Sequence, residues 1–215
     1  VSFISALAQS LERFGYTRAT RCLAQSFAQF SVEEAAMLAT KSPTSTIASP
    51  LVDVFDLTCL ASFFHSHPVV ISADADPAAE LTYDLLFSLL MVEYIEPWLQ
   101  QFDGVFLTDF PVQLSSLAEI NTTDPRKCQR FELYIGGIEV GNAFFELRDS
   151  AEQQRRFVRE NEYRGSLGLP VLPIDSGLIA ALAKGIPPTS GIAVGFDRLI
   201  ASLLGVTIDE IHPWD

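Results

Sequence analysis

Two apolar runs on either side of Gly136-Gly137 constrain the fold of this chain more than any other feature. Such runs, joined by a glycine turn, are typical of two antiparallel strands. Glu139 and Glu146 are embedded in the second run, where a carboxylate is costly to bury unless it is paired, hydrogen-bonded or bound to a metal. We therefore expect both carboxylates to face a cation. The alternative is that the glutamates lie on a solvated strand face, which suits Glu132 best.

The seven-residue separation between Glu139 and Glu146 would place them on opposite faces of a regular strand, because strand side chains alternate. One extra residue in the strand, a β-bulge, would restore a common face. Gly141-Asn142 is the expected place for this bulge or for a turn. The cation that we expect there is a divalent ion carrying nucleotide phosphates, or the ammonium group of a substrate.

A glycine-punctuated segment from Ser190 to Leu199 is the second informative feature. It predicts a short buried strand over 191–194, in which glycine lets a flat group approach the backbone, followed by a helix that begins near Arg198. An arginine at the start of a helix can stack on an aromatic ring or donate two hydrogen bonds to a phosphate group. The segment therefore indicates a nucleotide site. An ordinary strand, turn and helix with a solvated arginine is the alternative, since glycine-rich patterns are weak evidence.

The order of the patterns predicts an α+β fold, an antiparallel sheet flanked by helices with a helical N-terminal portion. We expect one partial domain over 1–215, in which 1–103 is a mostly helical flanking portion and 104–215 holds the sheet and the site. The expected strands cover 105–108, 130–135, 138–146 and 191–194. The expected helices begin at the capping pattern Ser31-Val32-Glu33-Glu34, follow Asp76-Pro77 as far as Met91, and cover 150–167 and 176–184.

Charge narrows the choice of partner. The chain has 14 Lys and Arg against 27 Asp and Glu, a net charge of −13, whereas nucleic-acid binders present basic surface to phosphate. A tRNA partner is therefore disfavoured. The 3 cysteines show neither a disulfide framework nor a zinc pattern, and the apolar stretches are shorter than the roughly 18 residues that span a bilayer. We expect a cytoplasmic protein without a membrane segment.

The two informative segments, about fifty residues apart, resemble the C-terminal part of class II lysyl-tRNA synthetase catalytic domains. They resemble more closely the stand-alone ligases of that family, which attach β-lysine to elongation factor P. The stretch 139–147 is similar to the family's Glu-(Leu/Ile)-(Ala/Gly)-Asn-Gly-Phe-x-Glu-Leu signature, and 191–198 to its third class-defining motif. Phe110-Pro111 with the Ser-Ser-Leu-Ala run at 115–118, and the last residues 211–215, match two further family segments. The resemblance covers roughly residues 80–215.

The resemblance implies a nucleotide subsite for ATP and Mg²⁺. Glu139 matches the position that meets ATP and its magnesium through a carboxylate, and Val140 the position that meets ATP through its backbone. Gly195 would let adenine lie against the strand, and Arg198 would pair with the nucleotide. Glu139 and Arg198 are therefore the residues expected to take part in catalysis, which in such chemistry is mostly positioning and charge neutralisation.

The resemblance also implies a subsite for a lysine-type amino acid. Glu146 matches the carboxylate that receives the substrate's amino group, and Asn142 the amide beside it. The chain departs from the family's usual residues at Ala143, Phe145 and Leu114, which bears on the identity of the substrate more than on the fold.

Two further family segments, an interface helix and strand ending in proline and a Phe-Arg-x-Glu loop, are not found in this sequence. We therefore expect a C-terminal portion that lacks full ligase activity by itself. The first interpretation is a β-lysine ligase that acts on elongation factor P. The second is a non-catalytic synthetase-like paralogue or fragment with a binding role, which the missing loop and the residues Ala143 and Phe145 favour. The third is a lysyl-tRNA synthetase. A homodimer is the family's common state, but its contacts come largely from the region not found here.

Overall fold

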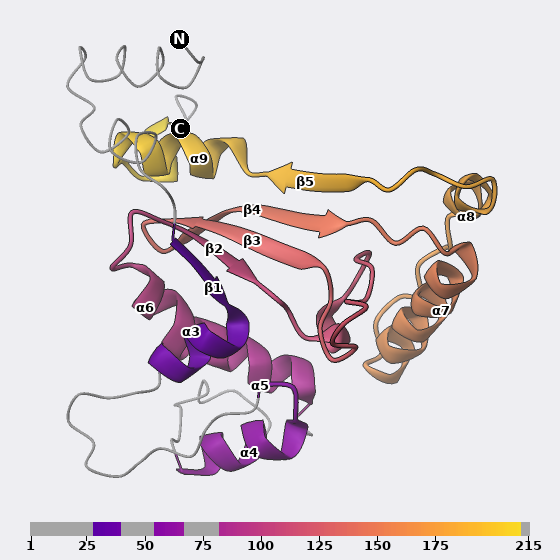
Figure 1. Cartoon of the computed structure of the whole chain (residues 1–215), viewed down its shortest axis with the longest axis horizontal. Helices are drawn as coiled ribbons and strands as arrows, with labels where there is room; N and C mark the ends of the chain where they lie inside the picture. The colour runs from indigo at the N-terminus through magenta and orange to yellow at the C-terminus, as the bar shows by residue number, and fades with distance from the viewer. Residues whose placement is uncertain (1–27, 40–53, 67–81, 212–215) are drawn as a thin grey trace.

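The computed structural model describes residues 28–39, 54–66 and 82–211. Its helices and strands follow one another in an order typical of an α+β chain, with most helices before β2 or after β4 (Figure 1). The strands are β1 (Ala28–Ser31), β2 (Gly104–Thr108), β3 (Arg130–Ile135), β4 (Ile138–Phe145) and β5 (Ser190–Val194). The helical segments are α3 (Val32–Ala39), α4 (Leu57–Ser66), α5 (Tyr83–Leu90), the π-helical turn η1 (Met91–Ile95), α6 (Glu96–Leu99), the 3₁₀ turn η2 (Val112–Leu114), α7 (Ser150–Ser166), α8 (Ser176–Ala183), α9 (Phe196–Leu204) and α10 (Ile208–Ile211).

The strands form a single sheet in the order β1-β2-β3-β4-β5. The last four strands are antiparallel neighbours, as predicted, and the hairpin between β3 and β4 turns at Gly136 and Gly137, both with positive φ. The antiparallel sheet flanked by helices is therefore confirmed. The expectation that the strand over 191–194 is buried is wrong, because Ile192 and Val194 of β5 are 53% and 47% exposed. The sequence interpretation missed β1, which pairs in parallel with β2 within the portion expected to be mostly helical. Its four residues alternate apolar and polar side chains, which is a strand pattern that the interpretation passed over, and the pairing joins Ala28 to the distant Val105.

The described helices of the N-terminal portion begin and continue for identifiable reasons. Ser31 caps α3, because its hydroxyl accepts a hydrogen bond from the Glu34 amide at 3.1 Å and the Glu34 carboxylate accepts from the Ser31 amide at 2.8 Å. The helix expected to end at Met91 instead runs on through η1 into α6. Its expected start after Asp76-Pro77 lies outside the described residues, as do residues 212–215 of the terminal family segment.

A β-bulge at Val140 decides which side chains share a face of the sheet. Tyr134 pairs with Glu139 and Leu133 pairs with Gly141, so that Val140 is the extra residue. The bulge was expected at Gly141-Asn142 and lies directly before them. Its effect is the expected one, since Glu139 and the even-numbered residues from Asn142 onward now lie on the same face.

Each face of the sheet has its own apolar cluster. On the face that carries Tyr134, residues of α5, η1 and α6 pack against Val105 and Leu107 of β2. On the opposite face, Ile135 and Val140 pack against α9. Figure 1 shows α3, α5 and α6 on one side of the strands and α9 on the other. No helix within the described ranges is long and apolar enough to cross a membrane.

Candidate active site

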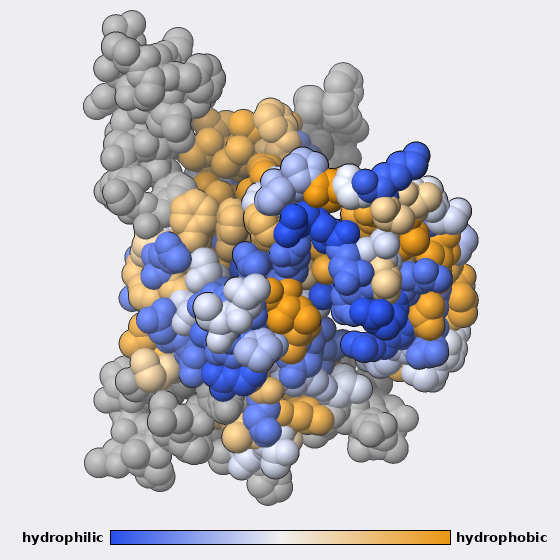
Figure 2. Space-filling view, turned by 45° about the vertical axis from the view of Figure 1, so that its right-hand side comes forward, coloured by the Kyte–Doolittle hydropathy of each residue, from blue (hydrophilic) through white to orange (hydrophobic). Residues whose placement is uncertain are grey.

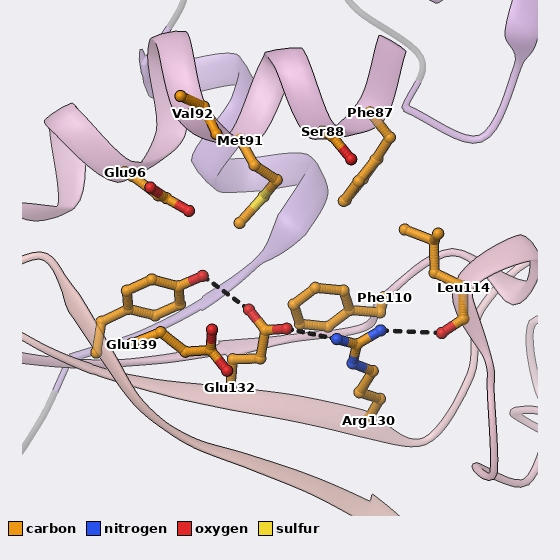
Figure 3. Close-up of a pocket in the computed structure, with 11 residues that line it drawn as sticks. Phe87, Ser88, Met91, Val92, Glu96, Phe110, Leu114, Arg130, Glu132 and Glu139 are labelled. Atoms are coloured by element: carbon orange, nitrogen blue, oxygen red, sulfur yellow. Dashed lines mark hydrogen bonds and ion pairs between the residues drawn. The ribbon is translucent and has the colours of Figure 1, made fainter. Parts of the chain in front are cut away.

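Three polar side chains of β3 form a hydrogen-bonded row on the face that is covered by α5 and α6. The Arg130 guanidinium donates to the Glu132 carboxylate at 2.5 Å, and the Tyr134 hydroxyl donates to the other oxygen of that carboxylate at 2.7 Å (Figure 3). Glu132 is only 6% exposed. The expectation that Glu132 lies on a solvated face is therefore wrong. A buried carboxylate needs partners, and this one has two.

The protonation of this row follows from burial and its partners. Burial raises the pKa of the Glu132 carboxyl, and the Arg130 guanidinium and the Tyr134 hydroxyl limit the rise. Burial, and next the Glu132 carboxylate, raise the pKa of the Tyr134 phenol. Tyr134 therefore stays protonated at neutral pH and remains a hydrogen-bond donor to Glu132.

A cavity of about 270 Å³ lies between this row and the helix above it (Figure 3). Its helical wall comes from α5, η1 and α6, and the π-helical turn supplies Met91 and Val92. Glu96 faces the cavity from α6, and Glu139 faces it from β4. Burial raises the pKa of Glu96, and the Glu139 carboxylate adds to the rise. The cavity is thus lined by carboxylates on both sides, with an apolar wall between them.

The expected nucleotide residues meet at the other end of this region. The Arg198 guanidinium lies 3.8 Å from the Glu139 carboxylate and 3.3 Å from its backbone oxygen. The side chains of Arg198 and Glu139 are 53% and 37% exposed, so both can reach a ligand. Gly195 is the N-cap of α9, and its amide donates to the Val140 carbonyl at 3.0 Å. A Cβ at Gly195 would make ordinary contacts of 3.5 to 3.7 Å with Arg198, so the protein's own packing tolerates a side chain there.

Only the backbone of Val140 lies beside the candidate site. Its side chain is 1% exposed and lies in the apolar cluster on the opposite face of the sheet. The bulge therefore leaves the Val140 carbonyl beside Gly195 while it removes the side chain from the ligand face.

The expected amino-acid residues follow along β4. The Asn142 side-chain oxygen accepts a hydrogen bond from Arg130 Nε at 3.2 Å. Glu146 lies one residue beyond β4, where its amide donates to the Thr189 carbonyl at 2.9 Å and its backbone forms a bridge with Ala118. The Glu146 carboxylate extends over Gly191 of β5, and a Cβ at that glycine would collide with the carboxylate oxygen.

The structure thus brings Glu139 and Arg198 into contact and aligns Glu139, Asn142 and Glu146 on one face of β4 and its continuation. Sequence reasoning missed Arg130, Glu132, Tyr134 and Glu96. The pattern Arg-x-Glu-x-Tyr was the available signal for the first three, because alternate residues of a strand share a face and the first two carry opposite charges.

A second cavity, of about 660 Å³, separates α7 from the segment 112–117. Figure 2 views the molecule from the side that carries α7 and α8, and hydrophilic surface gathers around the hollow there. Arg130 and Leu114 line this cavity as well as the first one, so their side chains form the partition between the two.

The carboxylates of the cavity fit a magnesium ion only if nucleotide phosphates supply most of its ligands. Within the described part of the chain, no group of three or more His, Cys, Asp or Glu side chains could hold a metal ion by itself. Glu132 is occupied by Arg130 and Tyr134, which leaves Glu139 and Glu96 as the accessible carboxylates of the cavity. Mg²⁺ bound to one or two carboxylates and to substrate phosphates is the common arrangement in nucleotide sites. The residues therefore fit an ion that is carried mainly by the nucleotide.

Comparison with known proteins gives a consistent result. The pattern of the family described as tRNA synthetases class II (D, K and N) matches residues 6–214. The elongation factor P--(R)-beta-lysine ligase of Hamiltonella defensa is 48% identical over 128 residues, which are 60% of this chain and 39% of that relative. The ligases of the same description from Buchnera aphidicola and Salmonella gallinarum are 44% identical over 126 residues and 46% identical over 122. They match 59% and 57% of this chain, and the matches span 39% and 38% of the two relatives.

Proposed function

Because the chain belongs to the class II tRNA synthetase family (D, K and N), we propose that it activates β-lysine as an adenylate and transfers it to a lysine of elongation factor P. The relatives described as elongation factor P--(R)-beta-lysine ligases support the choice within the family. The matches cover about two fifths of those relatives, 39% for the first, so the activity belongs to the proposal.

The observation that carries the proposal is the order of side chains along β4. Glu139, beside Arg198, lies at the proposed nucleotide end, Asn142 follows, and Glu146 lies at the proposed amino-acid end. The bulge at Val140 turns all three toward one face. A substrate lying along this strand would meet an arginine suited to phosphate, then an amide, then a carboxylate suited to an ammonium group.

The first step needs no protein acid or base. A carboxylate oxygen of the amino acid attacks the α-phosphorus of ATP, the bond to the β-phosphate oxygen breaks, and pyrophosphate leaves. Arg198 would hold the nucleotide and offset its charge. Glu146 would hold one ammonium group of the amino acid, so that the carboxylate of the amino acid faces the α-phosphorus. Magnesium, when bound at Glu139 with the phosphates, would neutralise part of their charge.

The second step would join the amino acid to the acceptor protein. The ε-amine of the acceptor lysine attacks the carbonyl carbon of the adenylate, the bond to AMP breaks, and the amine loses a proton. The net charge of −13 favours a protein acceptor over tRNA, whose phosphates a strongly acidic chain repels.

The departures from the family signature weigh less against catalysis than the sequence suggested. Ala143 pairs with Phe131 of β3, and Phe145 follows two residues later, so both lie on the face opposite Asn142 and Glu146. Neither side chain lies on the proposed substrate face. The non-catalytic alternative therefore loses the support that these two positions gave it.

ATP–pyrophosphate exchange with lysine and with β-lysine tests the proposal. The assay would use this chain and a version extended at its N-terminus with the corresponding part of the Salmonella gallinarum relative. We expect exchange with β-lysine in the extended protein, followed by a mass increase of elongation factor P when that protein is added. A folded extended protein that supports no exchange with either amino acid would refute the proposal, and exchange followed by transfer to tRNA alone would favour a lysyl-tRNA synthetase.

A further inference from the structure

We propose that Arg130 is a positioning residue that fixes the side-chain amide of Asn142 in one orientation, so that the amide NH₂ group faces the amino-acid substrate. The inference rests on the proposed function, because it concerns the same amino-acid subsite. It adds a residue that acts on the substrate through Asn142.

The hydrogen bonds of Arg130 determine the orientation of the amide. Arg130 donates from Nη1 to the Leu114 carbonyl at 3.0 Å and from Nη2 to Glu132 at 2.5 Å (Figure 3). It also donates from Nε to the Asn142 side chain at 3.2 Å. A guanidinium has only donors, so the Asn142 atom that faces it must be the amide oxygen. The amide nitrogen then points away from Arg130, as a donor.

The guanidinium itself is held firmly. It lies over the Phe110 ring at 4.5 Å and the Phe144 ring at 5.7 Å, and its side chain is 16% exposed. Its three acceptors come from β3, β4 and η2. The planar guanidinium of Arg130 stacks on two rings and donates to three acceptors, and the single ammonium group of lysine cannot make all of these contacts.

The orientation of the amide gives the amino-acid subsite a direction. An NH₂ donor at Asn142 suits an acceptor group of the substrate, which is its carboxylate, whereas Glu146 suits the ammonium group. The protein residues along β4 would then meet the substrate groups in the order phosphate, carboxylate and ammonium. Phosphate would lie at Glu139 and Arg198, the attacking carboxylate at Asn142, and the ammonium at Glu146. An amide turned the other way would repel the carboxylate that must reach the phosphorus.

Arg130→Lys tests the positioning role, with Arg126→Lys as the matched control because the Arg126 side chain is 57% exposed. Binding of β-lysine and of ATP is measured separately by calorimetry on the full 215-residue chain and on the extended protein. We expect Arg130→Lys to lower β-lysine affinity about tenfold and ATP affinity less than about twofold. The control should change neither. A parallel loss of both affinities would overturn the inference, because it would indicate a general structural role.

Asn142→Asp provides a test in which the fold is kept, since a carboxylate still accepts from Arg130 but has no NH₂ group. We expect β-lysine affinity to fall by at least about tenfold with an unchanged melting temperature. Equal or tighter binding would overturn the inference, since it would mean that position 142 meets the ammonium group. In an Asn142→Ala background, Arg130→Lys should have no further effect on β-lysine affinity, and additive losses would also contradict an action through Asn142.

The inference and the proposed function can fail separately. If neither the chain nor the extended protein binds ATP or β-lysine, the proposed function fails. The positioning role is then decided by the side-chain amide NMR signals of Asn142, identified by their loss in Asn142→Asp. A shift of these signals in Arg130→Lys, but not in Arg126→Lys, supports the inference, and unchanged signals overturn it.

Discussion

Gly191→Ala offers a test of the proposed amino-acid subsite without a change in any charged residue. A Cβ at position 191 would collide with the Glu146 carboxylate oxygen and lie 3.4 Å from its Cδ and 4.0 Å from its Cγ. The backbone of Glu146 is held by Thr189 and Ala118, so the side chain must swing aside. Gly191 itself does not have positive φ, and alanine therefore fits its backbone.

The two expected effects differ in size. The free energy of unfolding should change by no more than about 1 kcal/mol, the low end for overpacking, because only the far end of a flexible side chain moves. A hydrogen bond between a carboxylate and an ammonium contributes about 1.5 to 3 kcal/mol. Displacement of Glu146 should therefore weaken β-lysine binding roughly 10- to 150-fold, while ATP affinity stays the same.

Calorimetry with β-lysine and urea unfolding would measure both effects on the same preparation. Gly165→Ala is the matched control, because nothing lies within 4 Å of a Cβ at that position in α7. Glu146→Asp combined with Gly191→Ala should recover part of the affinity, since the shorter side chain avoids the new methyl group. Affinity for β-lysine within about twofold of the parent chain in Gly191→Ala would refute the assignment of Glu146 to the substrate amine.

Three further predictions concern single side chains. Arg198→Ala should weaken ATP binding about tenfold and leave β-lysine affinity unchanged in calorimetry, because Arg198 is 53% exposed and supports little of the fold; equal losses would indicate misfolding. The Arg126 side chain lowers the pKa of the Asp124 carboxyl from 3.8 to about 2. The stability that this ion pair contributes above pH 3.8 should therefore be lost as the pH falls toward 2, which urea unfolding at a series of pH values would measure. Asp124→Asn should remove that part of the pH dependence. Burial raises the pKa of the Cys128 thiol to about 11. Alkylation of the native protein near pH 8 should therefore modify the exposed Cys59 and spare the buried Cys128. Equal alkylation rates at the two cysteines, measured by peptide mass spectrometry, would contradict this.

The features that sequence predicted well are those with a local cause. The strands β3 and β4 follow from apolar runs around Gly136-Gly137, and the bulge followed from the phase of Glu139 and Glu146, one residue from where it was expected. The start of α3 followed from a capping pattern that involves neighbours in sequence. In each case, the residues that determine the structure lie within a few positions of one another.

The missed features depend on distant partners or on one added residue. Strand β1 exists because it pairs with β2, across a long sequence separation. The burial of Glu132 depends on the helix above the sheet, which no pattern within β3 reveals. The π-helical turn η1 adds a residue to a helix turn and shifts side chains toward the cavity, and the periodic pattern contains no sign of it.

The bulge at Val140 has a consequence for how this protein can vary. Glu139, Asn142 and Glu146 lie along β4 and its direct continuation, so the spacing between these three proposed contacts is set by covalent backbone. Thermal loosening of the surrounding helices would leave that spacing intact. A single deletion or insertion between Glu139 and Glu146 would instead invert one half of the site relative to the other. Substitutions at other positions of β4 would keep this spacing, whereas a change in the length of the strand would not.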